Sequence, residues 1–148
     1  MYYGILVPLD GSARAERIFK HVEGLALVSA AHLFLLQVVQ PEVVGDGYKG
    51  VLVEQSKQAT ERKIAEAESY LKRAAGVFRE KGIKCHTIVE VGSVVTGILR
   101  VAQREAVDLI AMASHGRSGL ARVFYGSVAA GVLQQIDRPL LLIRSRQG

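Results

Sequence analysis

Short runs of apolar residues alternate along this chain with longer stretches in which apolar residues recur every three or four positions. An apolar run bounded by glycine, proline or aspartate is typical of a buried strand, whereas a spacing of three and four places apolar side chains on one face of a helix. The pattern predicts five strands, at residues 5–9, 33–39, 84–91, 107–113 and 140–143.

A helix is expected in each of the four intervals between these strands. The longest covers residues 54–81, with Gly82 as its left-handed C-terminal cap, and the last covers about 126–135. The first follows Ser12, whose hydroxyl can accept a hydrogen bond from the first turn of the helix. The third carries the apolar face of residues 98–102.

Strands separated by helices predict an α/β fold, an open five-stranded parallel sheet with helices on both faces. The length of 148 residues, without a visible repeat, indicates a single domain over residues 1–148. In such sheets ligands bind beyond the carboxyl ends of the strands, where the strand order reverses. The residues to inspect are therefore those at the strand ends, namely Asp10, 38–40, Gly92 and 113–116.

The segment from Ala113 to Val128 leaves a predicted strand, passes through a glycine-containing loop and enters a helix at Gly126 and Ser127. The start of a helix offers free N–H groups and the positive end of the helix dipole to an anion. Glycine lets the backbone approach a phosphate closely. The segment predicts a phosphate site, with an ordinary loop and a capping Ser127 as the alternative. Neither a P-loop nor a G-x-G-x-x-G pattern is present.

Several motifs, taken together in this order, resemble the universal stress protein family. They are Val7-Pro8-Leu9-Asp10-Gly11-Ser12, Leu35-Leu36-Gln37-Val38-Val39, Val91-Gly92, the run 108–119 and Tyr125-Gly126-Ser127-Val128. The family's ATP-binding members carry G-x2-G-x9-G-[ST]. Here that pattern falls on Ala113, Gly116, Gly126 and Ser127, with alanine in place of the first glycine. The resemblance implies a Rossmann-like sheet of the adenine nucleotide alpha hydrolase type and membership of the ATP-binding subgroup.

The resemblance also implies a set of nucleotide-binding residues: Pro8, Leu9, Asp10, Val38, Ala113, Gly116, Arg117, Gly126, Ser127 and Val128. Pro8 and Leu9 would line the base pocket, and Val38 would offer backbone groups to the adenine edge. Asp10 would bind the ribose or the adenine, with a turn residue that caps the first helix as the alternative. Mg²⁺ would arrive with the phosphates of ATP. Alanine at position 113 is harmless if the backbone there is extended, and crowds the ligand if φ is positive.

The favoured function is an adenine-nucleotide-binding switch or sensor of the stress response, with slow ATP hydrolysis at most. His115 could act as the base for Ser114 or Ser127 as the nucleophile, but no carboxylate that would orient such a pair as its third member is evident. No spacing of residues predicts a set of metal ligands. The alternative is a dimeric interaction module that binds no nucleotide. Members of the family pair through the last strand, so a homodimer through Leu140–Ile143 is expected.

Charge and composition limit the classes of molecule that this protein is expected to bind. The net charge is +5, but basic residues are concentrated at 57–84 among glutamates, which is typical of a solvated helix face, so nucleic acid is an unlikely partner. The chain shows neither a signal-peptide pattern nor an apolar run of about 20 residues, and a cytoplasmic protein without a membrane span is expected.

The single Cys85 is expected to be a buried, inert thiol. Residues 40–53 are expected to form a long loop, which either covers the site or is an ordinary surface loop without a role there.

Overall fold

The computed structural model describes residues 1–45, 50, 52–114 and 126–144. The strands are β1 (Gly4–Leu9), β2 (His32–Val39), β3 (Cys85–Val91), β4 (Leu109–Ala113) and β5 (Leu140–Ile143). The helices are the short 3-10 helix η1 (Ala15–Ile18), α1 (Phe19–Ser29), α2 (Val53–Glu80), α3 (Val94–Arg104) and α4 (Gly126–Gln135). Strands and helices alternate along the chain as the apolar pattern predicts.

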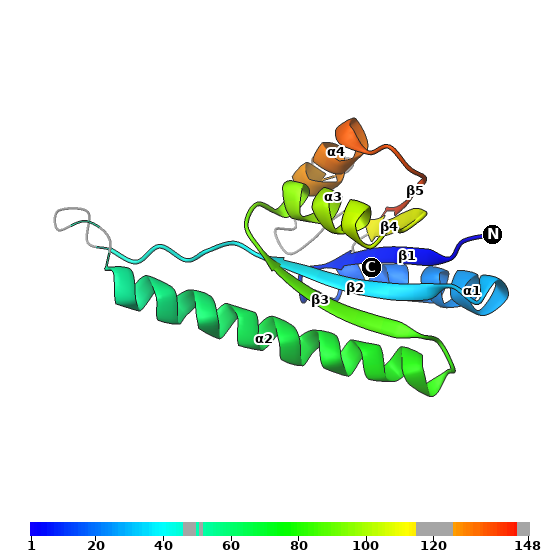
Figure 1. Cartoon of the computed structure of the whole chain (residues 1–148), viewed down its shortest axis with the longest axis horizontal. Helices are drawn as coiled ribbons and strands as arrows, with labels where there is room; N and C mark the ends of the chain where they lie inside the picture. The colour runs from blue at the N-terminus through cyan, green and yellow to red at the C-terminus, as the bar shows by residue number, and fades with distance from the viewer. Residues whose placement is uncertain (46–49, 51, 115–125, 145–148) are drawn as a thin grey trace.

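The five strands form one sheet in the order β3-β2-β1-β4-β5, and every neighbouring pair is parallel (Figure 1). The chain first adds β2 and β3 on one side of β1, then crosses to the other side and adds β4 and β5. The strand order therefore reverses between β1 and β4. The predicted open parallel sheet is confirmed, and the reversal marks the edge at which a ligand site is expected.

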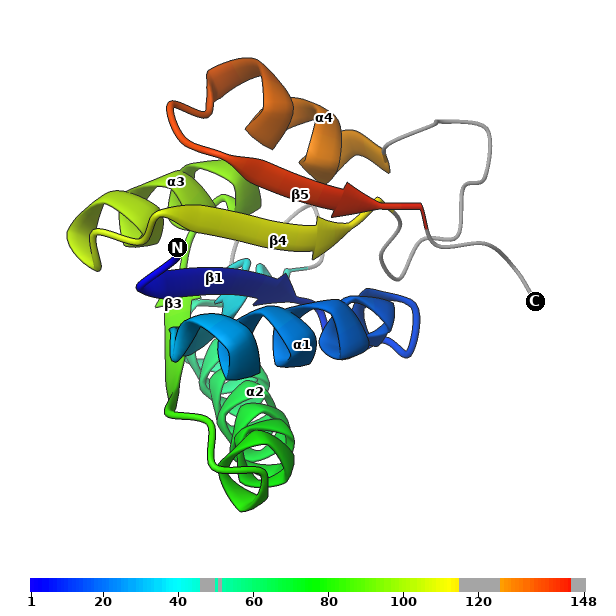
Figure 2. The same cartoon turned by 90° about the vertical axis from the view of Figure 1, so that its right-hand side faces the viewer.

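Helices cover both faces of the sheet, as predicted (Figure 2). On one face, β1 and β2 pack against α1 and α2 through a core that includes Val22, Leu35 and Phe78. On the other face, α3 and α4 pack against the sheet through Ile98, Val132 and their neighbours. Because both faces are covered, the central strands are apolar throughout rather than alternating.

Several predicted boundaries are off by one residue, and two elements differ from the sequence prediction by more than that. The fourth strand begins at Leu109 rather than Val107. Just before it, the carboxylate of Asp108 accepts hydrogen bonds from the backbone N–H groups of Tyr3 and Gly4 at 2.9 to 3.1 Å. The backbone N–H of Asp108 also donates to the Gly4 carbonyl at 3.0 Å, so Asp108 ties the start of β1 to β4 through both its side chain and its backbone. The first helix is divided into η1 and α1, although the Ser12 hydroxyl does accept from the Ala15 N–H at 3.2 Å.

The described part of the predicted 40–53 loop runs alongside the first turns of α2 and away from the sheet (Figure 1). Two hydroxyls on α2 satisfy its backbone. The N–H of Glu42 donates to Thr60 Oγ1 at 2.9 Å, and the N–H of Val44 donates to Ser56 Oγ at 2.8 Å. The start of this segment is therefore held on α2. Residues 46–49 and 51 lie outside the described residues, and the role of the loop as a cover stays a prediction.

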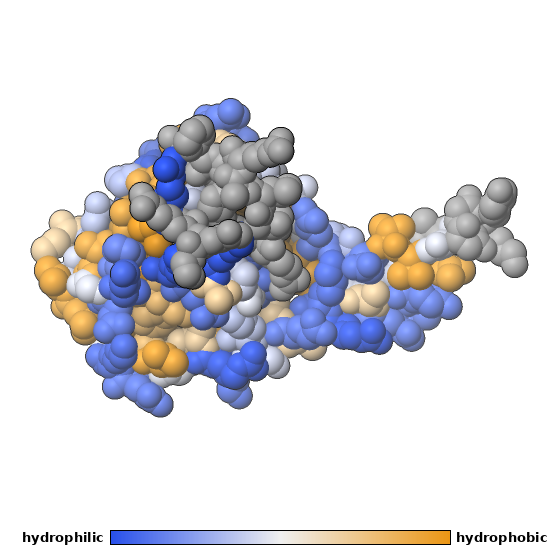
Figure 3. Space-filling model, turned by 180° about the vertical axis from the view of Figure 1, so that it is seen from behind, coloured by the Kyte–Doolittle hydropathy of each residue, from blue (hydrophilic) through white to orange (hydrophobic). Residues whose placement is uncertain are grey.

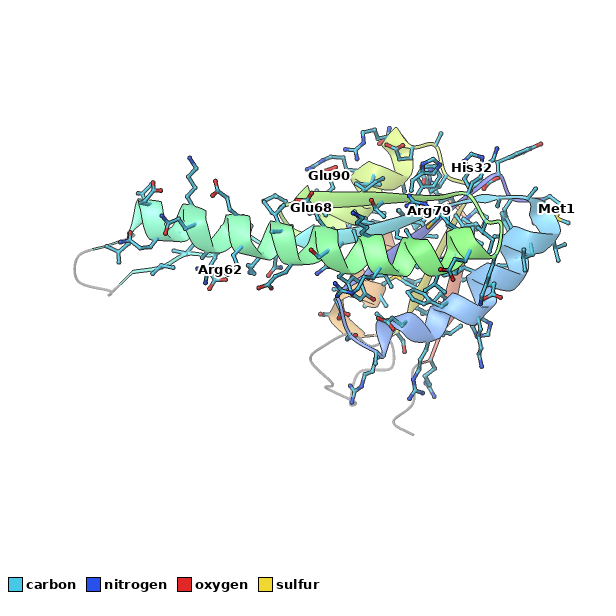
Figure 4. The ribbon with its side chains drawn as sticks, turned by 90° about the horizontal axis from the view of Figure 1, so that it is seen from below. Met1, His32, Arg62, Glu68, Arg79 and Glu90 are labelled. Atoms are coloured by element: carbon cyan, nitrogen blue, oxygen red, sulfur yellow. The ribbon has the colours of Figure 1, made fainter. Side chains whose placement is uncertain are left out.

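The surface of α2 agrees with the interpretation of its charges as a solvated face. Hydrophilic side chains cover its flank (Figure 3), and Arg62 and Glu68 lie among its exposed charged residues (Figure 4). Within the described part of the chain, no helix combines the length and the apolar character needed to cross a membrane. Cys85 is buried, and burial raises the pKa of its thiol to about 11, so the prediction of a buried thiol is confirmed.

Candidate functional site

A pocket of about 390 Å³ opens at the carboxyl ends of the strands, at the reversal between β1 and β4. This volume lies within the range of small-molecule sites. Its walls come from β1, β2, β4 and the first turn of α4, with α3 closing one side. Most of the wall is apolar, and Asp10 is the one ionisable side chain among the described residues that line it.

Eight of the ten predicted site residues line this pocket: Pro8, Leu9, Asp10, Val38, Ala113, Gly126, Ser127 and Val128. They come from four segments that are far apart in sequence, and the sheet brings them to one place because the strands are parallel and their carboxyl ends coincide. The other two, Gly116 and Arg117, lie outside the described residues. His115 also lies outside them.

The strand register decides which backbone groups of β2 face the pocket. The N–H of His32 donates to Tyr3 on the β1 side, whereas the N–H of Leu33 donates to Lys84 on the β3 side. Successive residues of a strand turn their N–H and C=O groups to alternate neighbours, so Val38 faces β1 as His32 does. The last residue of β1, Leu9, pairs with Gln37. The Val38 carbonyl therefore points into the space where β1 has ended.

Asp10 occupies the turn that follows β1. Its Oδ1 atom accepts a hydrogen bond from the N–H of Ser12 at 2.9 Å, and Ser12 in turn accepts from the first residue of η1. This bond agrees with the alternative interpretation of Asp10 as a turn residue, but the side chain that accepts from the first residue of η1 is that of Ser12 and not that of Asp10. The side chain also lines the pocket. The turn places the carboxylate at the mouth of the site, where it can accept hydrogen bonds from hydroxyl groups of a ligand.

The start of α4 forms the opposite wall. Gly126 has φ of +68°, a left-handed conformation that L side chains rarely adopt, so glycine is required at this position. Ser127 and Val128 follow in the first turn and line the pocket. The N–H groups of a first turn have no partner within the helix, and the positive end of the helix dipole lies there. This wall is suited to an anionic group.

Ala113 stands where the ATP-binding pattern has glycine. It is the last residue of β4, pairs with Ile143 of β5, and is not among the residues with positive φ. The backbone at this position is therefore extended, which any residue adopts. The condition under which alanine is harmless to the backbone is met, and its methyl group simply forms part of the pocket wall.

Several lining residues were not predicted as site residues: Ala15, Gln40, Val94, Ile98, Met112, Ser114 and Ala129. Met112 and Ser114 flank a predicted residue, and Gln40 lies directly after a strand. Their positions in the sequence could therefore have identified them as residues of the site. Val94 and Ile98 belong to the apolar face of α3, which looks like core in the sequence. Only the packing of α3 against β2, where a Cβ on Gly97 would lie 3.0 Å from Val38 Cγ2, brings that face to the pocket.

No three His, Cys, Asp or Glu side chains are grouped closely enough to hold a metal ion among the residues that the structure describes. Phosphate oxygens together with water are the ligands that Mg²⁺ prefers in nucleotide sites.

Comparison with known proteins identifies universal stress proteins that are similar to this chain. Universal stress protein MJ0577 of Methanocaldococcus jannaschii is 29% identical over 157 residues, which cover 99% of this chain and 97% of the relative. Its solved structure has a TM-score of 0.88 at 28% identity, covering 100% of this chain and 99% of the other.

Two further solved structures carry nucleotides. A universal stress protein in complex with cAMP has a TM-score of 0.71 at 21% identity, covering 98% of both chains. A universal stress protein from Archaeoglobus fulgidus in complex with dAMP has a TM-score of 0.69 at 21% identity, covering 96% of this chain and 98% of the other. At these identities the likeness shows the fold alone. The sequence model of the universal stress protein family matches residues 1–144, and this chain belongs to that family.

Proposed function

We propose that this protein binds an adenine nucleotide, with ATP as the expected ligand, in the pocket between β1 and β4. One observation carries the proposal. Eight residues that the family resemblance implies as nucleotide ligands, spread over four distant segments, line a single pocket of about 390 Å³ at the reversal of strand order. An accidental grouping of turn and core residues would not be expected to converge in this way. The ligands of the two solved neighbours, cAMP and dAMP, are adenine nucleotides and support the proposal.

The walls suit different parts of a nucleotide. The Val38 carbonyl, which points past the end of β1, accepts from the amino group of adenine, whereas the carbonyl oxygen of guanine would be repelled there. The Asp10 carboxylate accepts from ribose hydroxyls. The first turn of α4, with Gly126 and Ser127, receives the phosphates. When Mg²⁺ is bound, it neutralises phosphate charge, and Ser127 orients the phosphate chain.

The proposed role is a nucleotide-dependent switch or sensor with slow hydrolysis at most. Asp10 is the only ionisable group among the described lining residues, and its Oδ1 atom already holds the turn at Ser12. Turnover by wild type and by His115→Ala measures hydrolysis directly. Fast hydrolysis that is lost in the variant would replace this role with an enzymatic one. We further propose a cytoplasmic location and a single functional domain over residues 1–148.

Thermal unfolding with and without Mg-ATP tests nucleotide binding, with Mg-GTP as the control ligand. A ligand at ~100 times its Kd stabilises a fold by about 2.7 kcal/mol, which corresponds to roughly 5–10 °C in Tm for a chain of this size. We expect this shift with ATP, a much smaller one with GTP, and none in Gly126→Val. Gly82→Val is the matched control, because Gly82 also has a positive φ, of +81°, and no atom lies within 4 Å of an added Cβ. No shift with any nucleotide would refute the proposal.

A homodimer through β5 is the second proposal. β5 is the last strand in the sheet order and has a strand neighbour, β4, on one side. Its residues Leu140–Ile143 are all half-buried. An open apolar edge strand favours pairing with another strand, and two-fold pairing closes the assembly. Light scattering is expected to give about twice the chain mass of 16.0 kDa. If the dimer forms without nucleotide binding, the protein is the interaction module of the alternative hypothesis.

A further inference from the structure

We propose that His32 and His86 together bind a divalent transition-metal ion of the zinc, nickel and copper group. His32 is the first residue of β2, and His86 is the second residue of β3, the neighbouring strand at the edge of the sheet. His32 lies toward the end of the molecule that carries Met1 (Figure 4). Both histidines lie at the amino ends of their strands, whereas the nucleotide pocket lies at the carboxyl ends, so the two sites are separate.

The distance between the two imidazole rings carries the proposal. Nδ1 of His32 lies 3.0 Å from Nε2 of His86, although the two residues are 54 positions apart in the sequence. Two nitrogen ligands at neighbouring positions around one zinc ion, each about 2.0–2.1 Å from it, are roughly 2.8–3.4 Å apart. The two ring nitrogens therefore already have the separation of neighbouring metal ligands.

The same two nitrogens share a hydrogen bond in the structure. A neutral imidazole carries its proton on one of its two nitrogens, so one of the facing nitrogens donates and the other accepts. An ion takes the place of the shared proton, which moves to the outer nitrogen of the same ring. Both facing nitrogens then have a lone pair, and small rotations of the two side chains direct these lone pairs to one ion. A neutral pair loses no proton in this exchange.

The sheet holds the two rings in place. β2 and β3 are parallel, and Phe34 is the residue of β2 that pairs with His86. Because side chains alternate along a strand, His32, Phe34 and His86 lie on the same face of the sheet. The ring of Phe34 stacks on His86 with centroids 4.8 Å apart and ring planes at 22°, and Phe34 itself packs against the core on the α3 side. The pair is therefore ordered before an ion arrives, which lowers the cost of binding.

The chemistry of the pair selects the ion. Imidazole is a ligand for zinc, nickel and copper, whereas Mg²⁺ and Ca²⁺ prefer oxygen ligands. His86 is exposed and His32 is half-buried, so an ion can enter from solvent and water can complete its coordination. Among the residues that the structure describes, no third His, Cys, Asp or Glu is grouped with the pair. Two protein ligands with open positions suit an exchangeable ion, in contrast to the closed four-ligand sites of structural zinc.

A bound ion would link the edge strand to the rest of the sheet. In the described part of the chain, β3 has one strand neighbour, β2, and the two ligands come from these two strands. The ligands are brought together only by the folded ladder, so the ion binds the folded state in preference to the unfolded chain. We therefore expect Zn²⁺ to raise the Tm of the protein by holding β3 on β2.

Calorimetric titration of the untagged, nucleotide-free chain with Zn²⁺ tests the site. We expect saturable binding of one ion per chain, and no binding of Mg²⁺ at the same concentrations. In His86→Phe an aromatic ring can still stack on Phe34, but the ligating nitrogen is gone, so Zn²⁺ should bind at least about tenfold more weakly. In His32→Asn the amide can still donate to His86, and the same loss is expected. No binding by wild type, or wild-type affinity in either variant, would overturn the proposal.

His21→Asn is the matched control, because His21 is exposed on α1 and is not part of the pair. It should bind Zn²⁺ like wild type and show the same rise in Tm, whereas His32→Asn should show no rise. The ring C–H signals of the four histidines in an NMR spectrum give a second readout, each assigned by its loss in a single variant. Zn²⁺ should shift or broaden the signals of His32 and His86 together, before those of His21 and His115. A response that begins at His21 or His115 would contradict the site.

Discussion

Gly131 of α4 lies directly against Val95 of α3, so that a Cβ atom on Gly131 would be 2.7 Å from Val95 Cγ2. Valine is stiff at χ1 and cannot easily move aside. Gly131→Ala is therefore expected to push α4 away from α3 and to lower stability by about 1–3 kcal/mol. Because α4 begins at Gly126, the Tm shift with Mg-ATP should also become smaller. Thermal unfolding with and without ligand measures both effects.

Gly76→Ala is the control for this prediction. Gly76 lies in α2, and nothing is within 4 Å of an added Cβ. Alanine is favoured over glycine inside a helix by roughly 0.5–1 kcal/mol, so this variant should be as stable as wild type or slightly more stable. A Gly131→Ala protein that unfolds at the wild-type temperature would show that α3 and α4 tolerate a wider separation.

Substitutions at Asp10 separate its turn role from its proposed ligand role. In Asp10→Asn the amide oxygen can still accept from the Ser12 N–H, which lies 2.9 Å from Oδ1. We expect this variant to keep the stability of wild type and to bind ATP more weakly, because an amide is a poorer acceptor for ribose hydroxyls than a carboxylate. Asp10→Ala should lose about 1 kcal/mol of stability as well. Wild-type ATP affinity in Asp10→Asn would assign Asp10 to the turn alone.

Proline substitutions in β5 test pairing through its outer edge, which has no strand neighbour among the described residues. The carbonyls of Pro139 and Ile143 accept from β4, so the odd-numbered residues of β5 face β4 and Leu142 turns its N–H to the outer edge. Leu142→Pro removes a donor from that edge without breaking the β4 ladder. We expect a folded monomer by light scattering. Leu141→Pro is the contrast, since it removes a donor to β4 and should destabilise the fold. A Leu142→Pro protein that remains dimeric would place the interface elsewhere.

Cys85 predicts a dependence of stability on alkaline pH. Burial raises its thiol pKa from 9.0 to about 11, so the folded state disfavours the thiolate that the unfolded chain can form. The contribution of the thiol is complete below pH 9 and is lost as pH rises towards 11. Urea unfolding at pH 8 and pH 10.5 should show wild type losing on the order of 1–2 kcal/mol relative to Cys85→Ala. Parallel pH profiles for the two proteins would contradict the burial argument.

Local patterns were sufficient to predict the elements of this fold. The apolar runs are buried strands because both faces of the sheet are covered, and such strands carry no polar alternation. The left-handed Gly82 after α2 was predictable because glycine is the residue that adopts φ of +81° without cost. The end of α1 was not, since Ala30 adopts φ of +56° where no glycine marks the turn. Asp108 could not be separated from a strand, because its carboxylate acts on the backbone of Tyr3, 105 residues away.

The lining of the pocket was predictable where a residue belongs to a motif at a strand end or a helix start, as at Asp10, Gly126 and Ser127. The contributions of α3 could not be predicted, because Val94 and Ile98 differ from other core residues only in where α3 lies on β2. The same holds for His32 and His86, which meet only because β3 pairs with β2 in this register.

The amino-acid sequence by itself determined the alternation of strands and helices, the positions that need glycine and the residue types at the strand ends, since these depend on local periodicity and backbone conformation. The tertiary structure decided which strand ends meet, which backbone carbonyl faces the pocket and which two histidine rings lie in contact. Those outcomes depend on strand order and register, which arise from contacts between segments that are distant in the chain.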